Sequence, residues 1–127
     1  MIVADTDVLI DSMHGKEPSL GRIEVELSSG QLATTAITAF ELWSGVRTAR
    51  QADRVRDLLA AMTVLPFDEE AGVRAGILRR ELEAAGQGIG TADYLVAAVC
   101  LTRSAMLLTR NRAHFERVRD LSLATLS

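Results

Sequence analysis

Five short apolar runs recur along the chain, and longer segments separate them. The runs occupy residues 2–5, 31–35, 63–66, 105–109 and 121–125. None of them alternates cleanly between polar and apolar residues, and continuous apolar strands are typical of a parallel sheet covered on both faces. We therefore predict five parallel strands, each buried from two sides.

The segments between these runs are predicted to be helical at residues 18–29, 50–62, 68–85 and 92–103. In residues 68–85 the apolar positions recur with the period of one helix face. Asp68 is expected to cap this helix at its start and Gly86 to end it. Residues 92–103 are apolar almost all round, which predicts a central position.

This alternation predicts the element order β-α-α-β-α-α-β-α-α-β-α-β. With right-handed crossovers, that order is a three-layer α/β/α sandwich around a central parallel five-stranded sheet. We expect one domain that spans residues 1–127. In such open sheets the ligand site lies beyond the carboxyl ends of the strands, where the strand order reverses.

Composition supports a single globular domain. The chain has 127 residues, of which 48% are apolar and 24% charged, so disorder is not expected. The longest apolar run is far shorter than a membrane span, and no basic segment precedes the apolar N-terminus. Cys100, the one cysteine, lies in an apolar run and suits a reducing compartment. We expect a cytoplasmic protein with no membrane contact.

The net charge of −3 argues against nonspecific coating of nucleic acid, but the charge is uneven. From residue 102 onward the arginines outnumber the acids: Arg103, Arg110, Arg112, Arg117 and Arg119 stand against Glu116 and Asp120. Arg110 and Arg112 are therefore candidates for binding RNA phosphates, with a solvated surface as the equal alternative.

Three carboxylates stand in apolar surroundings that offer them no packing role. Asp5 ends the first apolar run, Glu41 lies within the apolar segment 37–43, and Asp93 opens the apolar segment 94–101. Buried acids are rare unless they are paired or bind a metal ion. All three are predicted to face one site, where a divalent cation would hold them together.

Four segments resemble motifs of the PIN-domain ribonucleases, in the family's order and over nearly the whole chain. Asp5-Thr6-Asp7-Val8 is similar to the opening D-T-N run, and Thr38-Ala39-Phe40-Glu41-Leu42 to the T-x-x-E-L segment. Asp93-Tyr94-Leu95-Val96-Ala97-Ala98 resembles the D-x-x-I-A-A helix. Thr109-Arg110-Asn111-Arg112-Ala113-His114-Phe115 resembles the T-x-[N/D]-x-x-x-F segment. The length of the chain and the order of these motifs are most similar to those of the VapC toxins.

The resemblance implies roles for the matching residues. Asp5, Glu41 and Asp93 would bind Mg²⁺, or Mn²⁺ in its place, and Thr6 or Thr109 would support the carboxylates. Asn111 falls where many relatives carry a fourth acid, and the resemblance implies a catalytic role for it too. As a neutral amide it would offer a carbonyl oxygen or orient a metal-bound water, without adding a charge. Asp7 departs from the usual Asn. If residues 5–7 are extended, Asp7 shares a face with Asp5 and partly replaces the missing charge.

The resemblance also implies an activity and partners. The activity is metal-dependent endonucleolytic hydrolysis of tRNA, rRNA or mRNA phosphodiesters by an activated water. The partners are a second copy of the chain, in a homodimer, and a cognate VapB-type antitoxin whose C-terminal segment blocks the site.

Other functions remain to be weighed against the nuclease. A catalytically weak PIN scaffold that binds RNA or a protein stays open because of Asn111, and a nuclease acting on DNA stays open too. A signalling receiver domain requires an acidic acceptor after the third strand and a lysine after the fifth. The third run here ends in Leu65-Pro66-Phe67, and Lys16 is the one lysine.

Overall fold

Four parallel strands form the central sheet of the computed structural model, which describes residues 1–126. The strands are β1 (Ile2–Ala4), β2 (Leu32–Thr35), β3 (Thr63–Leu65) and β4 (Met106–Leu108), in the order β3-β2-β1-β4. β1 is therefore a central strand, with β2 on one side and β4 on the other. The three-layer α/β architecture is confirmed, and four of the five predicted runs form strands of the sheet.

The predicted fifth strand, residues 121–125, is wrong for the described part of the chain. The segment makes one isolated parallel bridge, between Leu123 and Leu107. Arginine side chains bind the next two carbonyl groups: Arg112 donates to the Ala124 oxygen, and Arg22 to that of Thr125. Those carbonyls are thus hydrogen-bonded without extending the ladder.

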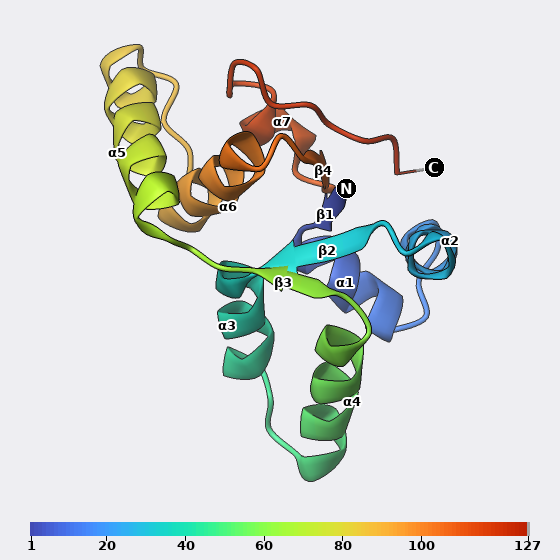
Figure 1. Cartoon of the computed structure of the whole chain (residues 1–127). Helices are drawn as coiled ribbons and strands as arrows, with labels where there is room; N and C mark the ends of the chain where they lie inside the picture. Colours follow the sequence, from blue (N-terminus) through green and yellow to red (C-terminus); the bar gives the residue numbers. More distant parts are fainter. Residues whose placement is uncertain (127) are drawn as a thin grey trace.

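Seven helices surround the sheet in the described residues, and Figure 1 shows them on its two sides. Their bounds are α1 (Thr6–Met13), α2 (Ser19–Ser29), α3 (Ala36–Ser44), α4 (Ala49–Ala60), α5 (Glu69–Ala84), α6 (Thr91–Thr102) and α7 (Arg112–Phe115). Asp68 caps α5 through the Ala71 amide at 2.9 Å, and Gly86 follows the helix with a positive φ of 69°. Both predictions for this helix are confirmed.

Two apolar cores lie on opposite faces of the sheet. Neighbouring strand residues point into different cores, as Val3 and Ala4 do on β1 and Leu107 and Leu108 do on β4. The first core includes side chains of α5, α6 and Phe115 of α7, and the second includes side chains of α1 to α4. Burial of both faces explains the continuous apolar runs of β1 and β2. The edge strands expose Thr63 and Val64 of β3 and Met106 of β4, so the prediction of burial from two sides is wrong at those positions. No helix in residues 1–126 has the length and apolar character of a membrane span.

Candidate active site

The site lies where the strand order reverses. β1 continues to β2 and β3 on one side, whereas β4 pairs with its other side. Asp5 directly follows β1 and Thr109 directly follows β4, so both occupy the carboxyl end of the sheet. Ligand sites of open parallel sheets form at this reversal.

Asp5 is the most buried acid of the site, with 8% of its surface exposed. One carboxylate oxygen, Oδ1, accepts from the Thr6 amide at 2.9 Å, so Asp5 also caps α1. The other, Oδ2, accepts from the Thr109 hydroxyl at 2.8 Å. Burial raises the pKa of Asp5 to about 6, the charges of Asp7 and Asp93 contribute to the rise, and the two hydrogen bonds oppose it.

Glu41 reaches the same region from α3. The Thr6 hydroxyl lies 2.6 Å from Glu41 Oε1 and 3.0 Å from the Thr38 hydroxyl. A hydroxyl has one proton to donate, and the shorter contact indicates that the Thr6 hydroxyl donates its hydrogen bond to Glu41. Because the Thr6 amide binds Asp5 while its side chain binds Glu41, a single residue connects two predicted ligands. The supporting roles predicted for Thr6 and Thr109 match these contacts.

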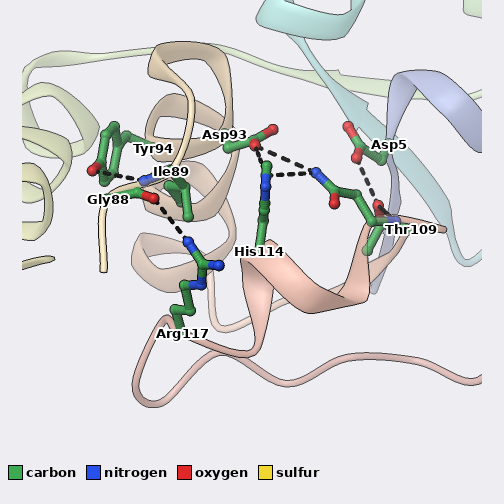
Figure 2. A network of polar contacts seen from close by, with 9 residues as sticks. Asp5, Gly88, Ile89, Asp93, Tyr94, Thr109, His114 and Arg117 are labelled. Atoms are coloured by element: carbon green, nitrogen blue, oxygen red, sulfur yellow. Dashed lines mark hydrogen bonds and ion pairs between the residues drawn. The ribbon is translucent and has the colours of Figure 1, made fainter. Parts of the chain in front are cut away.

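Asp93 comes from the first turn of α6, and its carboxylate faces the segment after β4 (Figure 2). Its Oδ2 atom lies 3.0 Å from His114 Nδ1 and 3.5 Å from Asn111 Nδ2. The Asn111 side-chain nitrogen is the donor to Asp93, and the same nitrogen lies 2.9 Å from His114 Nδ1. Asn111 therefore approaches the site as a hydrogen-bonding amide directed at His114 and Asp93.

His114 is the residue that sequence reasoning undervalued, since we did not predict a role for it in the site. A usable signal was present, because His114 stands three residues after Asn111 and α7 places that spacing on one side of a turn. The contact with Asp93 itself spans 21 residues and is a product of the fold.

The geometric argument for Asp7 is wrong. Residue 5 is extended, but α1 begins at Thr6, so Asp7 lies in a helical turn and the strand period of two does not apply. Asp7 Oδ2 accepts from the Arg110 amide at 3.1 Å, which joins α1 to the segment after β4. Burial raises the pKa of Asp7, and its Oδ1 atom is buried with no hydrogen-bond partner in residues 1–126.

The two arginines predicted to bind RNA are engaged within the chain. Arg110 Nε lies 3.0 Å from Asp11 Oδ2. Arg112 donates to the Ala124 carbonyl at 3.0 Å and lies 3.7 Å from Glu116. Both side chains remain about half exposed, at 54% and 45%, and a guanidinium has five N–H donors, so their role as RNA contacts stays a prediction.

The donor set suits a hard cation, since Asp5, Glu41 and Asp93 offer only oxygen atoms. Burial, and to a lesser extent neighbouring acids, raise the pKa of Asp5 and so disfavour its charged form. A bound cation would stabilise that charge. Within residues 1–126, however, no three Asp, Glu, His or Cys side chains form a ready-made metal cage. The prediction of three direct ligands therefore lacks support. Mg²⁺ commonly takes one or two carboxylates and keeps several waters, and the residues fit that pattern.

An apolar hollow of about 490 Å³ adjoins Glu41. It lies between α3, α6 and the start of the segment after β3, and is lined by Ile37, Phe40, Phe67 and Leu95, among others. Phe40 is the most exposed of the large apolar residues, at 71%. Such an apolar surface beside an acidic site is typical of a contact with another macromolecule.

Comparison with known proteins identifies the family of this chain. The PIN domain family model matches residues 2–121. Ribonuclease VapC10 of Mycobacterium tuberculosis is 34% identical over 95% of this chain and 90% of its own length. The chain belongs to the PIN-domain family, among the VapC proteins.

More distant VapC relatives also match over nearly the whole length of this chain. The tRNA(fMet)-specific endonuclease VapC of Shigella flexneri is 27% identical over 92% of this chain and 91% of its own length. The crystal structure of VapBC2 from Rickettsia felis, bound to a DNA fragment from their promoter, contains a similar chain. That chain has a TM-score of 0.84 and 25% identity, with 98% of both chains covered. The predicted family and fold are thus confirmed.

Proposed function

We propose that this VapC-family chain is a Mg²⁺-dependent endoribonuclease, with Mn²⁺ as a substitute, and the toxin of a toxin–antitoxin pair in the cytoplasm. One observation carries the proposal. Asp5, Glu41 and Asp93 come from three separate segments, and hydrogen bonds of Thr6, Thr109 and Asn111 link them across the sheet's reversal point. Acids in apolar surroundings are costly unless they are paired or bind a cation, so packing alone does not explain this arrangement.

The chain's own residues prepare an anionic, oxygen-lined site. The Thr109 hydroxyl and the Thr6 amide fix both oxygens of Asp5, and the Thr6 hydroxyl fixes Glu41. When bound, Mg²⁺ supplies charge neutralisation at the scissile phosphate and a water of lowered pKa. Asp5, Glu41 and Asp93 would hold the ion, directly or through its waters. The substrates proposed are tRNA, rRNA or mRNA, at unpaired positions where the backbone is accessible.

A catalytically weak scaffold that binds RNA or a protein is the second candidate. Asn111 favours it, because its side chain adds no negative charge where a fourth acid is expected and instead approaches His114. Binding without metal-dependent cleavage would distinguish the scaffold from the enzyme.

Two protein partners belong to the proposal. The first is a VapB-type antitoxin, supported by the likeness to VapBC2. The second is another copy of this chain. The apolar hollow beside Glu41 supports a homodimer, as does the exposure of Phe40, Trp43 and Phe67, because isolated domains seldom leave several aromatic residues exposed together.

Cleavage of a mixed tRNA and rRNA pool tests the proposed function. Purified antitoxin-free protein would be incubated with Mg²⁺, with Mn²⁺ or with EDTA, beside Asp5→Asn and Asp93→Asn. Asp57→Asn is the matched control, since it makes the same chemical change at an exposed position of α4. Discrete fragments should require metal, persist in the control and disappear in both site variants.

Two outcomes would redirect the proposal. Folded wild-type protein that binds RNA but leaves the pool intact in Mg²⁺ and Mn²⁺ would favour the scaffold. Equal cleavage of single-stranded DNA of matched sequence would show that the substrate class is not RNA.

A further inference from the structure

Two side chains approach the same oxygen atom of Asp93, Oδ2, an arrangement that leaves the other oxygen, Oδ1, available to a metal ion. His114 Nδ1 lies 3.0 Å from Oδ2, and Asn111 Nδ2 lies 3.5 Å from the same atom. The two nitrogens are themselves 2.9 Å apart. Figure 2 shows His114 between the carboxylate and the short helix α7.

The surrounding structure holds His114 in this place. The next residue, Phe115, is fully buried in the core that α6 also lines, so α7 is anchored against α6. Arg117 then donates to the Gly88 carbonyl at 2.9 Å, two residues before the cap of α6. The start of α6, which carries Asp93, and the helix that carries His114 are thus joined on both sides of the contact.

The proton in this contact can be assigned by elimination. Asp93 must be ionised to bind a cation, so it can only accept hydrogen bonds. The His114–Asp93 bond then requires a proton on Nδ1, and in the neutral form of the ring Nε2 is then the nitrogen that can accept. An amide can present either its nitrogen or its oxygen. With its oxygen toward the ring, Asn111 accepts from the His114 Nδ1–H and no longer donates to Asp93, so His114 alone holds Oδ2.

The contact is poorly suited to stabilising the fold as an ion pair. The side chain of His114 is 42% exposed and that of Asp93 22%. Exposed pairs contribute little to the free energy of folding because solvent screens them. A hydrogen bond that fixes the direction of a ligand has a different effect, since partners of metal ligands commonly change metal affinity by roughly 10- to 100-fold.

We propose that His114 is a positioning residue for Asp93: its Nδ1–H holds Oδ2 and thereby directs Oδ1 toward the metal. The inference rests on the proposed function, in which Asp93 binds the ion. At the position where a fourth acid is expected, this chain has Asn111. His114 orients the carboxylate already present, in place of an additional charge.

Substitutions at residue 114 distinguish the contribution of Nδ1 from that of Nε2. Asn places an amide nitrogen at the same number of bonds from Cβ as Nδ1, whereas Gln reaches the place of Nε2. We would measure Mn²⁺ affinity by electron paramagnetic resonance for the wild type and for His114→Ala, His114→Gln and His114→Asn. His14→Ala is the control for loss of the chain's other histidine, and thermal melting in EDTA would verify folding.

The expected result is Mn²⁺ binding that is roughly ten-fold or more weaker in His114→Ala and His114→Gln, and within about three-fold of wild type in His114→Asn. Equal affinity in all the variants would overturn the inference while leaving the metal site intact. Equal weakening in the Asn and Ala variants would overturn it too, since it would mean that the imidazole itself is required. Absence of Mn²⁺ binding by the wild type would instead refute the proposed function.

A second measurement needs no metal. Nitrogen NMR of the metal-free protein at pH 8 should find His114 protonated on Nδ1. Asp93→Ala should return the ring to Nε2 protonation, and His14 serves as the internal reference. Nε2 protonation of His114 in the wild type would overturn the proposed hydrogen bond, whatever the outcome of the cleavage assay.

Discussion

Replacing Asp5 by Asn should make the metal-free protein more stable at neutral pH while removing its activity. Asp5 is buried, and burial is the main reason that its pKa is raised from 3.8 to about 6. At pH 8 the folded, metal-free chain must therefore keep a carboxylate charged where the neutral form is preferred. Asn is neutral and nearly the same size. Its oxygen can accept from the Thr6 amide and its nitrogen can donate to the Thr109 hydroxyl.

The magnitude follows from the pKa. The rise from 3.8 to about 6 is roughly two pH units, and each unit corresponds to about 1.36 kcal/mol. Because the folded state binds the Asp5 proton more tightly than the unfolded state, the contribution of Asp5 to the free energy of unfolding is greatest below pH 3.8 and falls as the pH rises through 6. The full loss is about 3 kcal/mol, and roughly half of it falls between pH 5 and pH 8. The Asn variant lacks this titration.

Urea unfolding in EDTA at pH 5 and pH 8, for wild type and Asp5→Asn, measures this effect. The informative quantity is how the stability difference between the two proteins changes with pH, because a pH-independent packing change cancels from it. We expect the variant to gain about 1.5 kcal/mol relative to wild type from pH 5 to pH 8. Mg²⁺ should then stabilise the wild type, by about 2.7 kcal/mol at 100 times its Kd, and the variant much less. A stability difference that does not vary with pH would refute the reasoning.

Thr109→Val removes a buried hydrogen-bond donor to Asp5, so it should raise the pKa of Asp5 further. The free energy of unfolding should fall by about 1–3 kcal/mol. An unchanged midpoint of urea denaturation would contradict this prediction. Asp7→Asn removes a negative charge that raises the pKa of Asp5, so that pKa should fall, as followed by carboxylate NMR. Unchanged Mg²⁺ affinity in the same variant would count against a share of Asp7 in the metal site. Phe40→Ser should convert a dimer to a monomer in light scattering, with stability changed by about 0.5 kcal/mol at most, whereas Val25→Ser on the exposed face of α2 should remain dimeric.

Most of the architecture could be predicted from local patterns. The apolar runs and helical periods are local properties, so four strands and the ends of α5 matched their predicted places. The last run failed because pairing depends on a partner strand. Its carbonyls at Ala124 and Thr125 find arginine side chains instead, and nothing in residues 121–125 reveals this.

The candidate site, too, could be predicted from the sequence only in part. The chemical character of Asp5, Glu41 and Asp93 was visible in the sequence, because isolated acids within apolar segments require a reason. Their supporting contacts were only partly visible. The roles of Thr6 and Thr109 were expected from the family resemblance, whereas the turn that redirects Asp7 was not.

The sequence by itself determined four of the five predicted strands, the main helices and which acids had no place in a core, because periodicity and polarity are local properties of the chain. Only the tertiary structure decided which side chains meet. The parallel sheet brings residue 109 to residue 5, and the packing of α7 against α6 brings His114 to Asp93. Such contacts join residues 104 and 21 positions apart, and their geometry depends on how two buried faces pack, which no local pattern encodes.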